Sequence, residues 1–403
     1  MSPNKILGYL SAAPRVSTLP DAETSGPRAH VLGVIHAFQS LGWQVEAFIV
    51  GDQVPRNWVG SGSENLVSGN PFRSLAADLL RLTMGVVNSW RAWRFMRGKV
   101  DWVYERFATL QSLGSIFKRH KIPWILETNA LYFEEAARER KSLILTGIAK
   151  RLEIAAYHRC DVLICVSQPL KEMIIQRTGT PGEKILVVPN GVDINFFDPN
   201  KHSPRRIFTG FTIGYVGSLY AWQGLDLLFH AVSELRKDEG IEIFIVIVGD
   251  GLMRTEWEKL SSDLGITTHV KFIGNVPWKE VPEYIAGFDI GFSSKVLSKT
   301  DSDYFSPLKL YEYMSMGKPV LSSSLKDGND IVKQYKTGFV FPASDKIGLK
   351  NSLMEVYYSQ GKLMDLGYNA RQEAVEHFSW QHRVSNMIDG IETILDEIGR
   401  SYL

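Results

Sequence analysis

Short apolar runs alternate with longer amphipathic stretches along this chain, and the alternation occurs twice. Apolar runs of strand length predict buried strands, and the stretches with helical periodicity predict helices between them. Strands joined by helices form a parallel sheet that helices cover on both faces. We therefore expect an α/β protein with two doubly wound, Rossmann-like domains. Strands are predicted at 5–10, 43–50, 100–104, 124–127, 162–166 and 185–188, then at 212–216, 242–248, 270–273, 289–292, 320–323 and 338–341; helices are predicted at 28–41, 131–158 and 169–177.

The length and composition fit two domains. The chain has 403 residues, of which 44% are hydrophobic and 22% are charged, which is enough for two cores. The segment 189–204 is rich in turn residues and has no clear period, so we place the domain boundary near 200. We expect one domain over 1–200, a second over 201–378 and a final helix within 379–403. Two such domains facing each other would hold a ligand between the carboxyl ends of their sheets.

Several classes of protein are disfavoured. Cys160 and Cys165 are too few for a disulfide framework and lack metal-ligand spacing, which favours a reducing compartment. Because the sequence shows neither a leader peptide nor an apolar stretch of about 18 residues, we expect a cytoplasmic protein. No Gly-x-Gly-x-x-Gly follows the first strand of either half, which disfavours a dinucleotide-dependent dehydrogenase.

Positive charge is concentrated in one segment. Residues 71–160 hold 16 lysines and arginines against 8 acids, although the whole chain has a net charge of only +1. Within this segment, residues 75–99 interleave arginines with tryptophan and other apolar side chains, a pattern that suits an anionic bilayer surface. The alternative is a helix docked on a sheet with solvated arginines at its margins. No recognition motif accompanies the charge, so no nucleic-acid partner is expected.

A short predicted helix near residue 308 has the features of a nucleotide site. Pro307 suits the first helical position and Ser306 the cap, so the N–H groups from Leu308 onward can face an anion. Lys309 and Glu312, three residues apart, share one helix face. A cation beside phosphates and a carboxylate for sugar hydroxyls fit a nucleotide diphosphate. The alternative is an ordinary capped helix that packs on a sheet.

In order and spacing, the motifs of nearly the whole chain resemble those of the family 4 glycosyltransferases of GT-B fold. The motifs are Val188-Pro-Asn-Gly-Val-Asp193, Tyr215-Val-Gly-Ser-Leu219 with Gly224-Leu-Asp226, Val248-Gly-Asp-Gly251, Val270-Lys-Phe-Ile-Gly274, and Glu312 ahead of Met316-Gly-Lys-Pro-Val320. The resemblance implies transfer of a sugar from a nucleotide donor with retention of configuration, and a last helix that returns to the first domain. The implied donor contacts are Gly26, Gly217, Ser218, Gln223, Gly249, Asp250, Gly251, Ser306, Pro307, Leu308, Lys309 and Glu312.

One departure from the family pattern concerns the diphosphate. The family commonly has an arginine and a lysine where this chain has Ser218 and Gln223. Lys309 is therefore the expected cation, with Lys295 or Arg28 in reserve.

A second departure concerns the family's paired glutamates. Glu312 fits the later, ribose-contacting position, but Tyr304 stands eight residues before it, with Asp301 and Asp303 nearby. A subgroup with a similar Ser-Pro-Leu-Lys-Leu-x-Glu-Tyr-Met run, mostly associated with bacterial surface polysaccharides, also relaxes the first acid. Asp301-Ser-Asp303 resembles the Asp-x-Asp of metal-dependent transferases of a different fold. We interpret it as a solvated loop and expect no obligatory metal or cofactor.

The first domain supplies the expected acceptor side. Ser25-Gly-Pro-Arg-Ala-His30 occupies the position of the family's glycine loop, where the backbone of Gly26 can approach a ligand. Other polar residues follow the strands predicted at 100–104 and 124–127. Their alternative role is a strand-end network, for instance an ion pair between Glu127 and Arg106. The acceptor-side candidates are Arg28, His30, Arg106, Glu127 and Asn129; the catalytic candidates are Lys309, Glu312, Asn129 and Glu105.

No covalent nucleophile is evident in the sequence, so retention favours front-face substitution, in which the acceptor hydroxyl attacks from the side that the diphosphate leaves. The expected donor is a UDP-sugar, with a GDP-sugar next. The expected acceptor is a glycan or lipid-linked hydroxyl, reached by peripheral contact with the inner face of the membrane. The alternatives are a catalytically inactive nucleotide-sugar binder and a sugar-nucleotide epimerase.

Overall fold

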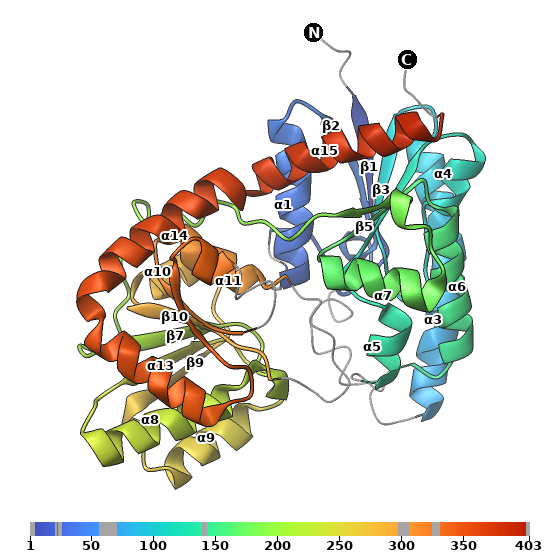
Figure 1. Ribbon diagram of the computed structural model, residues 1–403. Coiled ribbons are helices and arrows are strands. Elements are labelled where there is room, and N and C mark those ends of the chain that lie inside the picture. Colours follow the sequence, from blue (N-terminus) through green and yellow to red (C-terminus); the bar gives the residue numbers. More distant parts are fainter. Residues whose placement is uncertain are drawn as a thin grey trace. The chain divides into compact units, whose positions relative to one another are not determined.

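The computed structural model describes residues 5–20, 22, 26–55, 71–138, 143–296, 306–324 and 331–399. The chain divides into two compact units. Unit 1 comprises residues 1–189 and 380–403, and unit 2 comprises residues 190–379. Each unit contains one sheet of six parallel strands (Figure 1). The α/β prediction of two Rossmann-like domains is therefore confirmed.

The sheet of unit 1 has the strand order β2-β1-β3-β4-β5-β6. All neighbouring strands are parallel, and Tyr9 of β1 lies in register with Tyr104 of β3. Most strand residues are buried because helices cover both faces. The strands are β1 (Ile6–Ser11), β2 (Gln44–Ile49), β3 (Trp102–Arg106), β4 (Trp124–Thr128), β5 (Val162–Cys165) and β6 (Ile185–Val187).

Seven α-helices of unit 1 lie in the described residues. Figure 1 shows α1 and α15 on one side of the sheet and α3, α4 and α6 on the other. Right-handed crossovers produce this division, because the chain moves in opposite directions from β1 to β2 and from β2 to β3. The helices are α1 (Gly26–Ser40), α3 (Pro71–Met96), α4 (Ser115–Arg119), α5 (Tyr132–Arg138), α6 (Thr146–Arg159), α7 (Gln168–Thr178) and α15 (Trp380–Glu397).

The single helix predicted over 131–158 is wrong, because this region contains two helices, α5 and α6. The carboxylate of Glu153 accepts hydrogen bonds from the N–H groups of Tyr132 and Phe133, both at 2.9 Å. The carboxylate of Asp78 accepts two more from Ile144 and Leu145, just before α6. These buried acids bind backbone groups that the helix ends leave without partners.

The last helix packs on unit 1, as the resemblance implied. The indole of Trp380 lies directly on α1, where a Cβ added to Gly33 would come within 2.2 Å of Trp380 Nε1. The same indole contacts the His30 ring edge-on, with 4.8 Å between the ring centroids. Further along α15, Glu392 forms an ion pair with Lys5. Only a residue without a side chain at position 33 permits this approach.

The sheet of unit 2 has the strand order β12-β11-β10-β7-β8-β9. Separate clusters of buried apolar side chains contribute to its core. The strands are β7 (Thr212–Val216), β8 (Phe244–Val248), β9 (Val270–Gly274), β10 (Ile290–Ser293), β11 (Val320–Ser323) and β12 (Gly338–Phe341). The α-helices are α8 (Leu225–Glu239), α9 (Arg254–Asp263), α10 (Val281–Ala286), α11 (Leu308–Ser315), α13 (Lys346–Tyr358) and α14 (Leu363–His377).

Unit 2 begins before the boundary that we placed near 200. Asn190 is held by Ser306, whose hydroxyl oxygen accepts from Asn190 N at 2.9 Å and whose carbonyl accepts from Asn190 Nδ2 at 2.7 Å. Val192 N donates to the carbonyl of Phe378 at 2.9 Å, at the other end of the unit. The turn-rich segment after Pro189 is therefore bound to unit 2 by specific hydrogen bonds.

Each sheet has a point where the strand order reverses. In unit 1 the reversal lies between β1 and β3, and in unit 2 it lies between β7 and β10. Connections leave such neighbouring strands toward opposite faces, which opens a crevice at their carboxyl ends. Ligands of doubly wound sheets bind in this crevice, so these two places are where site residues are expected.

Candidate active site

Two glycine loops follow β7 and β8 in unit 2 and lie against each other. Gly217 N donates to Val248 O at 2.9 Å, and Leu219 N donates to Asp250 O at 3.0 Å. Gly217 and Gly249 have φ angles of +142° and +130°, which disfavour any side chain. A Cβ at Gly249 would come within 2.1 Å of Gly217 O. The contact brings together five predicted donor residues: Gly217, Ser218, Gly249, Asp250 and Gly251.

Lys309 lies at the first of these loops. Its Nζ donates to Gln223 Oε1 at 2.7 Å and stands 4.1 Å from the centroid of the Tyr215 ring. A Cβ added to Gly217 would lie 3.4 Å from the same nitrogen. Gln223 occupies a position where the family commonly has a lysine. Its side-chain oxygen therefore orients Lys309 of α11 toward the Gly217 loop. The aromatic face of Tyr215 adds a favourable interaction with the cation.

Glu312 lies one turn after Lys309 on α11 and is buried. None of the described residues donates a hydrogen bond to its carboxylate. Burial raises the pKa of Glu312 to about 7, although the nearby Lys309 opposes the shift. Desolvation lowers the pKa of Lys309 to about 7, and Glu312 opposes that shift. Both groups are thus held away from water at a cost that a bound anion and bound hydroxyls can offset.

The predicted cap of this helix is one residue out of place. Helix α11 begins at Leu308 with Pro307 in the capping position, and no side chain accepts a capping hydrogen bond there. The Ser306 hydroxyl instead accepts from Asn190 N and contacts the Tyr311 hydroxyl at 3.2 Å. The first N–H groups of α11 consequently lack intrahelical partners, and the positive end of the helix dipole begins beside Lys309.

Other charged residues near the glycine loops are bound to protein groups. Asp250 accepts hydrogen bonds from Gly251 N and from Arg254 Nη1, both at 2.8 Å. Arg254 also donates to Glu258 at 2.9 Å, so its charge is shared between two acids. Lys295 is buried just after β10, where its backbone N–H donates to the Ser323 hydroxyl at 3.0 Å.

A second cluster lies at the carboxyl ends of β3 and β4 in unit 1. Glu127 is its centre: Oε1 lies 2.6 Å from His30 Nε2, and Oε2 accepts from the Tyr104 hydroxyl at 2.8 Å. In the orientation that satisfies its neighbours, the Asn129 amide donates to Glu127 Oε1 at 2.9 Å and accepts from Arg106 Nη2 at 3.3 Å. The structure thus brings together four predicted acceptor-side residues: His30, Arg106, Glu127 and Asn129.

The electrostatics of this cluster favour a charged Glu127. Burial disfavours its ionisation, but attraction to His30 and Arg106 and the hydrogen bonds from His30 and Tyr104 are stronger, so its pKa is lowered. The pKa of Arg106 is raised by neighbouring groups that include Tyr132 and Glu127, despite burial. Arg106 Nε has no hydrogen-bond partner among the described residues. Arg106 therefore retains donor capacity at a strand end.

Three other candidates of the first domain are not among the residues that contact Glu127. Arg28 Nη2 donates to the carbonyl of Leu19 at 3.0 Å, and burial lowers its pKa against the attraction of Asp52. Gly26 is exposed at the start of α1. Glu105 is fully buried, and its two oxygens accept from Leu113 N at 2.7 Å and Gly114 N at 2.8 Å. Through these hydrogen bonds Glu105 anchors the loop that contains Leu113 and Gly114. Its catalytic role stays a prediction.

Replacing Glu105 by alanine is expected to destabilise unit 1. The change leaves two buried N–H groups without acceptors, at a cost of about 2–4 kcal/mol in the free energy of unfolding. Urea unfolding monitored by tryptophan fluorescence measures this cost. Glu183→Ala, which removes an exposed acid from the same unit, serves as the control. A Glu105→Ala variant with unchanged stability would contradict the anchoring role.

The sequence does not indicate a site role for some of these residues, and other candidates lie outside the described residues. Tyr215, Tyr104 and Trp380 were not singled out as parts of a site, because an aromatic residue in a strand or helix normally indicates core. Only their partners, Lys309, Glu127 and His30, give them a role. Ser25, Asp301, Asp303 and Tyr304 are not among the described residues. Nowhere in the described ranges do three or more histidine, cysteine or acidic side chains form a group that could hold a metal ion.

Family models match both halves of the chain. Residues 24–196 match the model described as Glycosyltransferase Family 4, and residues 199–373 match the model described as Glycosyl transferases group 1. The chain therefore consists of two glycosyltransferase domains. The boundary between the two matches falls within the turn-rich segment, and the second match contains Gly217, Lys309 and Glu312.

Curated relatives are glycosyltransferases of glycan and glycolipid synthesis. The UDP-Gal:alpha-D-GlcNAc-diphosphoundecaprenol alpha-1,3-galactosyltransferase of Escherichia coli is 26% identical over 304 residues, which are 72% of this chain and 75% of the relative. The GDP-mannose-dependent alpha-(1-6)-phosphatidylinositol monomannoside mannosyltransferase of Mycolicibacterium smegmatis is 24% identical over 57% of this chain and 61% of the relative. The matches to the first relatives span about half to three quarters of their lengths.

Solved structures share the fold. The Anabaena protein HepE in complex with UDP-glucose matches with a TM-score of 0.63 and 18% identity, over 98% of this chain and 99% of that chain. Because the match covers both units, it establishes a GT-B architecture for the glycosyltransferase chain.

Proposed function

We propose that this protein is a retaining glycosyltransferase that moves a sugar from a nucleotide-diphosphate donor to a hydroxyl acceptor in glycan, polysaccharide or glycolipid synthesis. The observation that carries the proposal is the position of Lys309, bound to Gln223 and beside the Gly217 loop at the strand-order reversal of unit 2. A UDP-sugar is the favoured donor and a GDP-sugar the next. One relative is named for each kind of donor.

The donor roles follow from the chemistry of each group. The phosphates are assigned to the loops that contain Gly217, Ser218, Gly249 and Gly251, and the first N–H groups of α11 at Leu308 and Lys309 can donate to them. The Lys309 ammonium balances the charge of the diphosphate, and Glu312 accepts from the ribose hydroxyls. Gln223 positions Lys309 and does not supply charge itself. No obligatory metal or cofactor is part of this proposal.

The acceptor side is assigned to the cluster in unit 1. Arg106 retains a buried donor, and the Asn129 amide is held between Arg106 and Glu127. His30 is held by Glu127 and by Trp380, so α15 contributes to its position. Such preoriented polar groups suit the hydroxyls of a sugar acceptor. Arg28 and Gly26 are weaker candidates, because Arg28 is directed toward Leu19 and Asp52.

The proposed chemistry is a front-face substitution at the anomeric carbon. The bond from this carbon to the diphosphate oxygen breaks, and a bond to the acceptor oxygen forms on the same face. The acceptor proton passes to the departing phosphate, so no protein base is required. Lys309 and the start of α11 stabilise the negative charge that develops on the leaving group. The residues of unit 1 position the acceptor hydroxyl.

A thermal-shift panel tests the proposal. UDP, GDP, ADP, TDP and CMP are compared, with NAD as the control, in the presence and absence of a divalent metal. A ligand bound only by the folded protein raises the melting temperature by mass action. One diphosphate should raise it without metal, and Lys309→Ala should abolish the shift. If none of the nucleotides raises the melting temperature, the donor-site assignment is wrong.

UDP affinity is expected to fall as the pH rises from 7.5 to 9. The free protein has a Lys309 pKa of about 7, and a diphosphate favours the protonated amine. Binding therefore takes up a proton in this range, and the dissociation constant rises by up to roughly tenfold per pH unit. Calorimetric titration in two buffers of different ionisation enthalpy measures both the affinity and the proton uptake.

Two variants identify the group that titrates. Lys309→Met should remove the pH dependence. Glu312→Gln should keep it, because Glu312 has a pKa of about 7 and is largely ionised in the range measured. A dissociation constant that is the same at pH 7.5 and 9 in the unmodified protein would contradict the role of Lys309.

Cellular location is part of the proposal. No helix in the described ranges is long and apolar enough to cross a membrane. We place the enzyme in the cytoplasm, with peripheral contact to the inner face of an anionic membrane through the basic segment 71–160. Lipid-linked acceptors, such as those in the names of two relatives, would be reached from that surface.

A further inference from the structure

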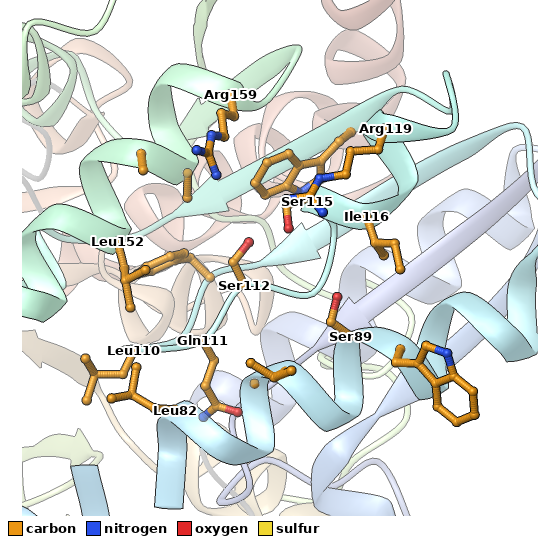
Figure 2. Close-up of a pocket in the computed structure, with 17 residues that line it drawn as sticks. Leu82, Ser89, Leu110, Gln111, Ser112, Ser115, Ile116, Arg119, Leu152 and Arg159 are labelled. Atoms are coloured by element: carbon orange, nitrogen blue, oxygen red, sulfur yellow. The ribbon is translucent and has the colours of Figure 1, made fainter. Parts of the chain in front are cut away.

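Unit 1 contains a cavity of about 500 Å³ whose lining includes none of the residues of the strand-end cluster (Figure 2). It lies in the helical layer formed by α3, α4 and α6. Helix α4 has only five residues, from Ser115 to Arg119, whereas α3 has 26 and α6 has 14. The short helix cannot fill the layer between its longer neighbours, so a hollow remains. Its apolar walls are formed by Leu82, Val86, Trp90, Leu110, Ile116 and Leu152.

Polar groups line this cavity along its length, with Gln111 at the opposite end of the view from Arg119 and Arg159 and Ser112 between them. Figure 2 shows Arg119 and Arg159 toward one end of the view and Leu82 and Leu110 toward the other. Neither arginine forms an ion pair with any described residue. Gln111 Oε1 and the Ser112 hydroxyl line the cavity, are buried, and have no hydrogen-bond partner among the described residues. Buried groups without partners are costly, which indicates a polar ligand there.

The surface around the cavity is apolar and positively charged. Val86, Val87 and Trp90 on α3 are 75%, 55% and 55% exposed, and Ile148 and Leu152 on α6 are 43% and 41% exposed. Exposed apolar side chains in this density mark an interaction surface and not an ordinary solvated face.

The exposed charges on α3, α4 and α6 all have the same sign. Their only acids are Asp78 and Glu153, and both are buried and bound to backbone N–H groups. All exposed charges of α3, α4 and α6 are therefore basic, as at Arg94, Arg119 and Arg159. A surface that combines tryptophan, aliphatic side chains and unopposed cations is complementary to anionic lipid.

We propose that this cavity binds one hydrocarbon chain of an anionic phospholipid, and that Arg119 and Arg159 bind the lipid phosphate. The apolar walls bury the chain, and the Ser112 hydroxyl, which lies between the arginines and the far end of the cavity, donates to an ester oxygen. The exposed apolar residues of α3 and α6 enter the bilayer around this anchor. The inference deepens the proposed membrane contact and does not depend on the donor site.

Vesicle co-sedimentation tests the charge requirement. The full chain should bind vesicles of phosphatidylcholine that contain phosphatidylglycerol, and bind pure phosphatidylcholine vesicles roughly tenfold or more weakly. Arg119→Ala with Arg159→Ala should lose this preference. The control pair Lys237→Ala with Lys271→Ala removes two exposed cations from unit 2 and should keep it. Equal losses in both pairs would mean non-specific charge attraction and would overturn the proposal.

A bilayer-free experiment tests the cavity itself. Dihexanoyl-phosphatidylglycerol, used below its micelle concentration, should bind in native mass spectrometry, whereas glycerol phosphate should bind at least tenfold more weakly. Ala155→Phe, which fills the cavity, should abolish lipid binding, and Ala76→Phe on the exposed surface of α3 should not. Equal binding of the two ligands would identify a simple phosphate site and overturn the lipid assignment. UDP binding, measured on every variant, should be unchanged, so failure here is distinguishable from failure of the donor site.

Discussion

Replacing Lys309 by alanine is expected to lower the turnover of the donor sugar by about 100-fold to 1000-fold. The ammonium lies 2.7 Å from Gln223 and beside the Gly217 loop, so its charge acts where the diphosphate leaves. Loss of one preorganised group that stabilises leaving-group charge has an effect of this size. The measurement is the rate of nucleotide release from the sugar donor whose base stabilises the protein in the thermal-shift panel.

The stability of the variant distinguishes chemistry from folding. Desolvation lowers the pKa of Lys309, so the folded protein already holds the charged form at a cost. Its removal should therefore change the melting temperature by no more than about 3 °C. Lys271→Ala, at an exposed position of the same unit, should leave turnover unchanged. Turnover of the Lys309→Ala variant within threefold of the unmodified protein would reject the assignment.

The strands were predictable because their apolar runs are short and bounded by turns. The ranges 212–216, 320–323 and 338–341 coincide with β7, β11 and β12. In a parallel sheet both faces are buried, so the run of apolar residues marks the whole strand. The interruption between α5 and α6 was not predictable, because it depends on Asp78 and Glu153, which bind backbone groups distant in the sequence.

The donor residues were predictable as residue types but not as an arrangement. The sequence placed Gln223 where a cation was expected, and only the structure shows that its oxygen accepts from Lys309. The capping error at Ser306 has a similar cause, since its hydroxyl is taken by Asn190, 116 residues away. Such long-range bonds leave no local signal, whereas a glycine after a strand does.

Replacing Gly249 by alanine is expected to disrupt the donor site and the fold of unit 2 together. The φ angle of +130° strains any side chain, and the new Cβ would meet Gly217 O at 2.1 Å. Strain and overpacking together should cost about 2–5 kcal/mol, which lowers the melting temperature by roughly 5–15 °C. The displaced Gly217 loop should also weaken UDP binding by at least about 100-fold.

Gly265→Ala separates backbone strain from the contact between the two loops. Its φ angle of +71° also disfavours a side chain, but a Cβ there meets no atom within 4 Å. This control should therefore lose only about 1 kcal/mol and should bind UDP normally. Chemical unfolding and UDP titration of the two variants measure both quantities. Equal stabilities, or normal UDP binding by Gly249→Ala, would show that the contact between Gly249 and Gly217 does not shape the donor site.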